Sequence, residues 1–580
     1  MEKSNFVHAG NLSDLESAGC MAVQAGGHLL ALFSEGGLVY AVDNRCPHMG
    51  FPLDRGSVNG GILTCHWHHA RFDLESGGTF DQFADDVRTF PVELRGNEIW
   101  VDLAARGDPR AHQRERLLVG LERDIPLVMG KAVQVLMEGD GDPRDPFRIG
   151  LDFGARYRRG GWGQGLTMHA CFMNLMPALR VDDRPRAMYH GLAAVARDSF
   201  GHAPRFPVRP LPDSSADFRA LKAWFRRFIA VRDDEGAERC VVSAIRAGAT
   251  GAQMADMLFS AVTDYRMIDA GHPADFTNKA FEALDLAGWE YAETVLTSLT
   301  SGYAGARRME ESNAWRNPID LVLILEDAFE KLPAALQAGE AARADRAWEG
   351  FKALVEILLE DDPGAIGESL LEALREGSRP EELASAVSYA AALRIARFHT
   401  SNEFTDWDSS LHTFTFANAI EQGLRRSPSV ETLRGVFDAA MSVYLDRFLN
   451  IPPARIPDVS GDPGHTKQEL ARLPDLLDQQ QQVNQAAASL ARYLSAEGDD
   501  RELLAMIGRL LLREDRDFHT IQTIEAAFRQ YAKFRGKPEG VHVLVAAIRY
   551  LAAHAPTVRA QGQTYEIAYR LHRGDRLYEG

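Results

Sequence analysis

Two short segments near the start of the chain combine residue types that bind iron. Residues 46–48 read Cys-Pro-His and residues 65–68 read Cys-His-Trp-His, so each segment offers one thiolate and one imidazole. A [2Fe-2S] cluster with two cysteines on one iron and two histidines on the other needs this ligand set, and the imidazoles raise its reduction potential. The spacing therefore predicts a cluster bound by Cys46, His48, Cys65 and His68. A zinc ribbon is the alternative that these residue types leave open.

Strand-like sequence surrounds both segments and would hold them in place. Residues 29–33 and 38–42 flank a Glu-Gly-Gly turn, and residues 90–94 and 99–103 flank an Arg-Gly-Asn turn. Apolar and polar positions alternate in these runs, which is typical of β-hairpins. We expect a small all-β domain over residues 1–104, followed by a polar linker that contains glycine and proline.

The two loops and the run that follows them resemble the Rieske family, in its ferredoxin and oxygenase branch, over about the first 104 residues. The resemblance implies a domain that carries one electron at a time and performs no bond chemistry itself. His66 and His69 stand where the family usually has proline and glycine. Because these histidines are neighbours of the ligands, we expect them to affect the potential, the proton coupling or the access of the cluster rather than its formation.

From residue 113 onward the apolar period changes from 2 to about 3.6, which predicts helices. A chain of 580 residues and 64.2 kDa is too long for one core. We therefore predict a multidomain protein with a small all-β domain followed by a large all-α domain. Residues 105–165 are expected to form a linker and a first helical segment, and residues 166–580 an all-helical domain. Candidate helices include 217–231, 275–299, 380–398, 430–449 and 501–512.

The composition indicates which classes of partner and which cellular compartment to expect. A formal charge of −18 argues against nucleic acid, and no apolar run of eighteen residues is present to cross a membrane. Five cysteines are too few and odd in number for a disulfide framework. The amino-terminal sequence lacks the features of a secretory signal. We expect a cytoplasmic protein.

Several histidines of the helical region are candidates for a second metal. We predict His190, His272, His399, His412 and His519 as ligands of a mononuclear non-haem iron. Asp408 and Asp515 each precede one of these histidines by four residues, so they could orient the rings if the helices run through. Taken singly, each histidine also fits a structural role in a helix. The Asp/Glu-x-x-His-x-x-x-x-His helix of ring-hydroxylating Rieske oxygenases is not found, so that architecture is not expected.

The segments around His190, His412 and His519 resemble the questin oxidase-like family over residues 165–540. This resemblance implies a histidine-rich iron site and oxygen-dependent oxidation or cleavage of polycyclic aromatic polyketides. The family's early Asn-His helix is represented in this chain by Asn174-Leu175, so His169 would have to replace that histidine.

Two functions follow from these expectations. In the first, the cluster passes electrons to the helical domain, where an iron oxidises a small organic substrate. In the second, the chain is an electron carrier or redox sensor whose helical domain binds a partner. Neither a dinucleotide fingerprint nor a flavin motif is visible, so we expect an external ferredoxin or reductase as electron donor. A homo-oligomer is compatible with the sequence.

Overall fold

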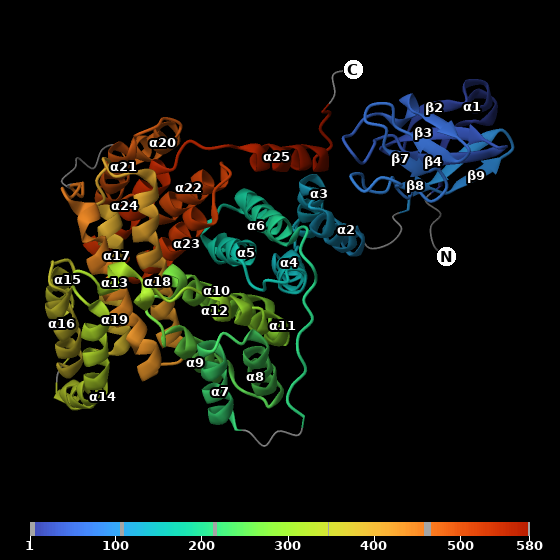
Figure 1. Ribbon diagram of the computed structural model, residues 1–580. Helices are drawn as coiled ribbons and strands as arrows, with labels where there is room; N and C mark the ends of the chain where they lie inside the picture. The colour runs from blue at the N-terminus through green and yellow to red at the C-terminus, as the bar shows by residue number, and fades with distance from the viewer. Residues whose placement is uncertain (1–5, 105–108, 213–216, 346, 458–465, 578–580) are drawn as a thin grey trace. The chain divides into compact units, whose positions relative to one another are not determined.

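The structure is a computed structural model that describes residues 6–104, 109–212, 217–345, 347–457 and 466–577 (Figure 1). Within these ranges every strand lies before residue 103 and the remainder is largely helical. The predicted fold class, a small all-β domain followed by a large all-α region, is confirmed. None of the described helices combines the length and the apolar character needed to cross a bilayer.

The β domain contains ten strands and two short helices among the described residues. These are β1 (Phe6–Asn11), α1 (Leu12–Ala18), β2 (Cys20–Ala25), β3 (His28–Glu35), β4 (Leu38–Asp43), the 3-10 helix η1 (Leu53–Arg55), β5 (Ser57–Asn59), β6 (Ile62–Thr64), β7 (Arg71–Asp73), β8 (Thr89–Phe90), β9 (Val92–Arg95) and β10 (Glu98–Asp102).

A long series of helices follows the strands along the described part of the chain. In order, these helices are α2 (Pro109–Arg123), α3 (Pro126–Leu136), α4 (Arg144–Arg156), α5 (Gln164–Leu175), η2 (Met176–Ala178), η3 (Val181–Asp183), α6 (Arg184–Ser199), α7 (Phe218–Ala230), α8 (Asp234–Arg246), α9 (Gly251–Val262), η4 (Ile268–Gly271), α10 (His272–Ala287), η5 (Trp289–Tyr291), α11 (Ala292–Thr297), α12 (Thr300–Gly305), η6 (Met309–Glu311), α13 (Asn313–Arg316), α14 (Leu321–Asp345), α15 (Phe351–Leu358), α16 (Pro363–Arg375), α17 (Pro380–Ala396), α18 (Phe404–Arg426), α19 (Val430–Leu445), η7 (Asp446–Asn450), α20 (Thr466–Leu477), α21 (Val483–Ser495), α22 (Asp500–Leu512), α23 (Phe518–Lys533), α24 (Pro538–Ala553) and α25 (Ala560–His572).

Three small antiparallel sheets make up the β domain, with strand orders β1-β10-β9, β2-β3-β4-β8 and β5-β6-β7. The first predicted hairpin forms as β3-β4, and its turn residues Gly36 and Gly37 have φ of +60° and +78°. Glycine adopts these left-handed angles without steric cost, which is why two glycines mark this tight turn. The second predicted hairpin forms as β9-β10.

Two apolar clusters form the core of the β domain. One lies where β1, β3 and β10 meet and is centred on fully buried residues such as Leu30, Ile99 and Val101. The other includes Leu63 and Phe72 on the hairpin β6-β7, together with both Cys46 and Cys65. The second core therefore supports the two cysteine-bearing loops directly.

The chain divides into two compact units, residues 1–149 with 561–580, and residues 150–560. This division differs from the expected segments 105–165 and 166–580, because α2, α3 and α25 belong with the β domain. The guanidinium of Arg45, for example, donates to the carbonyl oxygens of Leu571 (2.8 Å) and Asp575 (2.9 Å). The carboxylate of Asp85 likewise accepts a hydrogen bond from Gln113 of α2 at 2.7 Å.

One predicted helix of the larger unit is interrupted in the structure. The sequence period indicated a single helix over residues 275–299, but α10 ends at Ala287 and the chain continues through η5 into α11. Gly288 follows with φ of +120°, a left-handed angle that ends the helix because only glycine adopts it readily.

Helices α5, α10, α18 and α23 pack in a closed ring within the larger unit, since each contacts the next and α23 contacts α5. Their interior is polar. The ammonium of fully buried Lys279 donates to Glu282 (2.8 Å) and to Glu525, and the guanidinium of Arg529 donates to both glutamates at 3.0 Å. Burial alone would lower the pKa of Lys279, but the two carboxylates outweigh it and raise that pKa.

Replacing Lys279 by methionine should destabilise the larger unit by about 3–5 kcal/mol, because two buried carboxylates would lose their closest cation. Denaturant unfolding of the full chain would measure the change. Lys331 is the matched control, since its ammonium pairs with Asp327 on an exposed face of α14. Lys331→Met should change the unfolding free energy by less than about 0.5 kcal/mol. Equal effects of the two substitutions would contradict this account of the core.

Candidate metal centres

Each of the two cysteine-bearing loops contains the same kind of backbone turn. In the first loop the N–H of Gly50 donates to the carbonyl of Cys46 (2.7 Å), and in the second the N–H of His69 donates to the carbonyl of Cys65 (3.0 Å). Each bond joins residues four apart, so both loops curl in the same way. Gly50 and His69 therefore occupy equivalent positions.

Those equivalent positions have left-handed backbones, with φ of +82° at Gly50 and +59° at His69. A residue with a Cβ pays steric strain at such an angle, which explains why glycine is usual there. The side chain of His69 is exposed. Its neighbour His66 is also exposed and forms a hydrogen bond with the Ser57 hydroxyl (2.9 Å).

The loop turns direct backbone N–H groups at the two sulfur atoms. The N–H groups of His48 and Met49 donate to Cys46, and those of Trp67 and His68 donate to Cys65. The two cysteines also hydrogen-bond to each other, which lowers the pKa of Cys65 to about 6 and raises that of Cys46. Both cysteines are buried. The site thus holds adjacent sulfurs surrounded by donors that stabilise thiolates.

The two histidines of the loops lie close to each other. The rings of His48 and His68 lie 5.0 Å apart, and the ring of Phe83 lies 4.8 Å from that of His48. Nδ1 of His48 is buried and has no hydrogen-bond partner among the described residues. Burial lowers the pKa of His48 to about 4, so its ring is neutral and can donate a lone pair. Two thiolates and two imidazoles at one place fit a [2Fe-2S] cluster.

Comparison with known families agrees with this geometry. The family model described as "Rieske [2Fe-2S] domain" matches residues 5–91. Residues 5–91 are a Rieske [2Fe-2S] domain. The four predicted ligands lie within the matched range, and this Rieske domain is the electron-transfer part of the chain.

Relatives of the Rieske domain include small ferredoxins. The ferredoxin component of the naphthalene 1,2-dioxygenase/salicylate 5-hydroxylase systems of Ralstonia sp is 27% identical over 100 residues, which are 17% of this chain and 96% of the ferredoxin. Human apoptosis-inducing factor 3 is 29% identical over 134 residues, which are 23% of this chain and 22% of that protein. Among solved structures, the ferredoxin of carbazole 1,9a-dioxygenase from Nocardioides aromaticivorans IC177 is 28% identical, covers 17% of this chain and 98% of that chain, and has a TM-score of 0.17.

Three of the five histidines predicted for a second metal come together in the helical unit. One ligand nitrogen from each of His272, His412 and His519 lies within 4.8 Å of the others. The ring centre of His412 lies 4.8 Å from the ring centre of each of the other two histidines. His272 is the first residue of α10, His412 lies within α18, and His519 is the second residue of α23. The ring of helices therefore brings them together across about 250 residues of sequence.

The environment of this histidine triad suits metal binding. Nδ1 of His272 and Nε2 of His519 are buried without a hydrogen-bond partner among the described residues. Burial, with a contribution from the neighbouring imidazoles, lowers the pKa of His272 to about 3 and that of His412 to about 4. Burial also lowers the pKa of His519. Three neutral imidazoles therefore present lone pairs at neutral pH, as metal ligands must.

A strained segment precedes His272. Met267, Asp269 and Ala270 have φ of +36°, +45° and +55°, and Gly271 has +98°. Left-handed angles in non-glycine residues cost on the order of 1–3 kcal/mol each and cluster at functional sites. No sequence signal revealed this strain, because alanine and methionine do not mark left-handed turns.

The two predicted orienting carboxylates differ in their placement. Asp408 and His412 both lie within α18 and share a helix face, as the spacing suggested, but the Asp408 carboxylate does not contact the His412 ring. Nδ1 of His412 donates to the backbone carbonyl of Asp408, while the Asp408 carboxylate accepts from Tyr550 at 3.2 Å. Asp515 precedes α23, which begins only at Phe518, so it does not share a helix face with His519. Its carboxylate accepts the N–H of Ala560 at 3.0 Å instead.

His190 and His399 lie outside the triad. Within the described ranges, the groups of three potential metal ligands include neither of them. The ring of His190 packs 6.0 Å from Phe172, and Nδ1 of His399 hydrogen-bonds with the Ser401 hydroxyl at 2.7 Å. His169 is buried on α5, where its ring fills the space above Gly150 and Gly191.

Sequence reasoning missed a polar layer one helical turn beyond the triad. Asp275, Thr415 and Gln522 each follow one of the three histidines by three residues and are almost fully buried. The Thr415 hydroxyl donates to Asp275 at 3.0 Å, and burial raises the pKa of Asp275 to about 7. The repeated spacing of three residues was the signal that could have found this layer.

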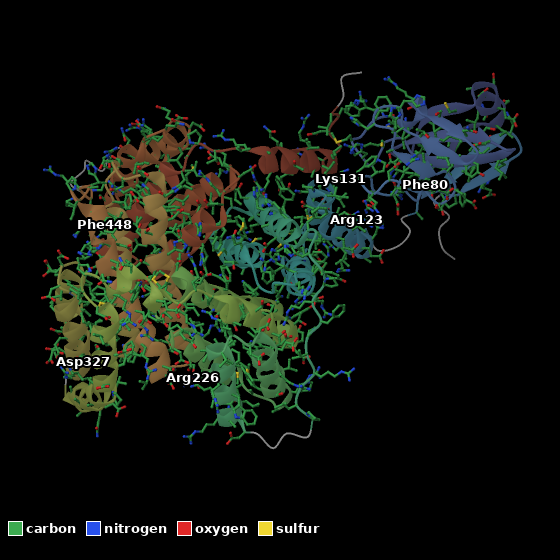
Figure 2. The ribbon with its side chains drawn as sticks, in the orientation of Figure 1. Phe80, Arg123, Lys131, Arg226, Asp327 and Phe448 are labelled. Atoms are coloured by element: carbon green, nitrogen blue, oxygen red, sulfur yellow. The ribbon has the colours of Figure 1, made fainter. Side chains whose placement is uncertain are left out.

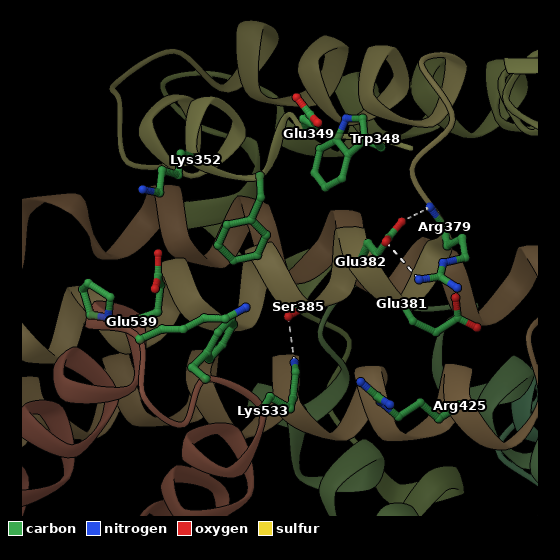
Figure 3. Close-up of a pocket in the computed structure, with 14 residues that line it drawn as sticks. Trp348, Glu349, Lys352, Arg379, Glu381, Glu382, Ser385, Arg425, Lys533 and Glu539 are labelled. Carbon is green, nitrogen blue, oxygen red and sulfur yellow. Dashed lines mark hydrogen bonds and ion pairs between the residues drawn. The ribbon is translucent and has the colours of Figure 1, made fainter. Parts of the chain in front are cut away.

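A large cavity lies far from the triad on the same helices (Figure 3). It has a volume of about 1240 Å³, and its walls include Arg425 of α18 and Lys533 of α23. Lys533 is the last residue of α23 and His519 the second, so about 21 Å of helix separates them. The Lys533 ammonium donates to Ser385 at 2.7 Å, as the dashed line shows. The cavity is therefore not the pocket of the histidine triad.

A second group of potential ligands, Asp85, Asp86 and His112, lies in the smaller unit. Asp85 accepts hydrogen bonds from His112 and Gln113 at 2.7 Å each and pairs with Arg116 at 3.3 Å. The Asp85 carboxylate thus has hydrogen-bond and ion-pair partners from α2, and these contacts account for its position without a metal.

Replacing Cys65 by serine should abolish the [2Fe-2S] cluster, because serine cannot supply the soft thiolate that the ferric iron needs. The absence of the cluster would be measured as a loss of visible absorption and of the paramagnetic signal after reduction. His69→Gly is the matched control, since glycine suits the left-handed position and His69 is not among the four predicted ligands. A colourless His69→Gly protein would contradict the ligand assignment.

Acid should destabilise the metal-free protein through the histidine triad. The rings stay neutral in the folded chain down to about pH 3 to 4 for His272 and His412. In the unfolded chain they take up protons below about pH 6.5. As the pH falls through this window, the unfolded state therefore binds more protons than the folded state. The free energy of unfolding should fall below its value above pH 6.5 by up to about 1.4 kcal/mol per pH unit for each histidine.

Urea unfolding at several pH values, in the presence of a chelator, would measure this slope. The variant with glutamine at His272, His412 and His519 should show a clearly shallower dependence between pH 6.5 and 4. The same slope in both proteins would show that these histidines do not titrate as described.

Proposed function

We propose that the chain is an oxygen-dependent oxidoreductase in which the Rieske domain supplies electrons to a non-haem iron held by His272, His412 and His519. The observation that carries the proposal is the convergence of these three histidines, with two of their nitrogens buried and unpaired among the described residues. A domain for single-electron transfer in the same chain favours a redox metal over a zinc ion at this triad.

When bound, an iron at this triad would supply oxygen activation. The backbone carbonyl of Asp408 fixes the His412 ring by accepting from Nδ1, which leaves Nε2 as the lone-pair nitrogen of the neutral ring. Asp275 lies one turn away with a pKa of about 7, so it can hold or release a proton near neutral pH. All three histidines are partly exposed, which leaves room for a small molecule to approach.

Aromatic side chains around the triad support an aromatic substrate. The rings of Phe276 and Phe518 lie 5.6 Å and 5.4 Å from that of His272, and 5.9 Å from each other. Phe518 is buried, whereas Phe276 is partly exposed and offers an apolar face on which a planar substrate can stack. With the resemblance to the questin oxidase-like family, we propose a polycyclic aromatic phenol or quinone as the substrate class.

The electron donor is proposed to be a separate ferredoxin or reductase. The matched ferredoxins are described as components of dioxygenase systems, and one solved complex joins an oxygenase with its ferredoxin. The exposed side chains of His68, Phe80 and Phe83 are the proposed docking edge of the Rieske domain. Phe80 is labelled in Figure 2. A cytoplasmic location is part of this proposal.

Metal analysis of the full chain tests the proposal. We expect a third iron beyond the two of the cluster. The variant H412A/H519A should lose this third iron, and with it substrate-dependent oxygen uptake, while keeping the cluster spectrum. H399A is the matched control and should retain all three irons, because His399 lies outside the triad.

Two results would overturn the oxygenase proposal. Two irons per chain in the wild-type protein, after anaerobic reconstitution, would favour the electron carrier or redox sensor. Zinc in place of the third iron, with no oxygen uptake on a hydroxylated anthraquinone probe, would assign the triad to other chemistry.

A further inference from the structure

A lysine from outside the Rieske domain contacts the first cluster loop. The ammonium of Lys131, on α3, donates to the backbone carbonyls of Pro47 and His48, the latter at 2.6 Å. Lys131 is labelled in Figure 2 and lies in the same compact unit as the loop. Its side chain is partly buried, so the cation is shielded from bulk water where it meets these carbonyls.

The two carbonyls belong to the peptide groups that serve a cluster sulfur. The Pro47 carbonyl shares its peptide with the N–H of His48, and the His48 carbonyl shares its peptide with the N–H of Met49. These are the two N–H groups that donate to Cys46. A chain of hydrogen bonds therefore runs from the ammonium, through two peptides, to the ligand sulfur.

We propose that Lys131 raises the reduction potential of the [2Fe-2S] cluster by polarising these two peptides toward the Cys46 sulfur. A cation on a carbonyl draws electron density from the peptide and makes its N–H a stronger donor, since hydrogen bonds in chains reinforce one another. Stronger donation to a cluster sulfur is one of the factors that set the potential of an iron-sulfur centre.

The direction of the effect follows from charge. On reduction the cluster gains one electron from an external one-electron donor, and no proton needs to move. The reduced cluster carries one more negative charge, so a nearby cation and strengthened N–H donors stabilise it more than the oxidised cluster. Burial lowers the pKa of Lys131 to about 8, which still leaves the ammonium form dominant at pH 7.

Other charges near Lys131 do not cancel its effect. Asp85 lies close enough to raise the pKa of Lys131, but this carboxylate is already bound by α2 through His112 and Gln113. Arg116 and Arg45 are the other nearby cations, and Arg45 is occupied by the carbonyls of Leu571 and Asp575. Lys131 is thus the cation that donates hydrogen bonds to the carbonyls of the cluster loop itself.

Lys131 lies beyond the part of the chain that the Rieske family model matches, which ends at residue 91. The inference concerns the Rieske domain alone and holds whether or not the helical unit contains a third iron.

A redox titration of the full chain at pH 7, followed by the paramagnetic signal of the reduced cluster, tests the proposal. At a fixed applied potential, K131M should shift the ratio of reduced to oxidised cluster about tenfold toward the oxidised form. For a one-electron couple, this shift means a reduction potential about 59 mV lower than that of the wild type. K131Q, which keeps a hydrogen-bond donor without the charge, should also lower the potential. K131R should restore most of the wild-type value.

R123M is the matched control because it removes one positive charge from the exposed end of the neighbouring helix α2 (Figure 2). It should leave the potential unchanged. An unchanged potential in cluster-loaded K131M or K131Q would overturn the proposal, and so would an equal decrease in R123M. If neither neutral variant holds a cluster while R123M does, the role of Lys131 is to support assembly, and the tuning proposal is wrong.

Discussion

The backbone turn that closes each cluster loop is the constraint on which the electron-transfer part of this protein depends. A bond across four residues at Cys46 and again at Cys65 curls the chain so that N–H groups face the sulfurs. The same curl leaves the cysteines buried and the histidines near the surface. The hairpin β6-β7 and the apolar cluster that it shares with both cysteines hold the two loops close to each other.

In the helical unit, by contrast, the histidines of the triad are far apart in sequence and are brought together by helix packing. The four central helices of this unit enclose a polar column, with the histidine triad followed by Asp275 and Thr415 and then by the ion pairs of Lys279. Buried charges seldom improve stability over apolar packing. Beside this column, nitrogens of His272 and His519 are buried without a hydrogen-bond partner among the described residues, which supports the proposed metal site at the triad.

The sequence predicted those features that are local. The cluster ligands lie within a few residues of each other in each loop, and the turn Gly36-Gly37 marks its hairpin directly, so both could be inferred from spacing. The convergence of helices cannot be inferred in this way, so the sequence does not separate His190 and His399 from the histidines that form the triad. The spacing of Asp515 to His519 fits one helix face, yet the helix begins later, where Asp517 caps it by accepting the N–H of Thr520. The contact of Lys131 with the first loop depends on tertiary packing, which no local pattern records.

The wide sequence separation of the triad has a consequence for the newly made chain. His519 lies near the end of the sequence, so the Rieske loops leave the ribosome hundreds of residues before the last of the three imidazoles. A product that ends before His519 would carry both cluster loops, but it would lack the segment that Arg45 contacts and would contain only two of the three triad histidines. Any metal that needs all three would find no site in such a fragment, so the proposed oxygen-activating centre would form only after α10, α18 and α23 had all been made and had packed together.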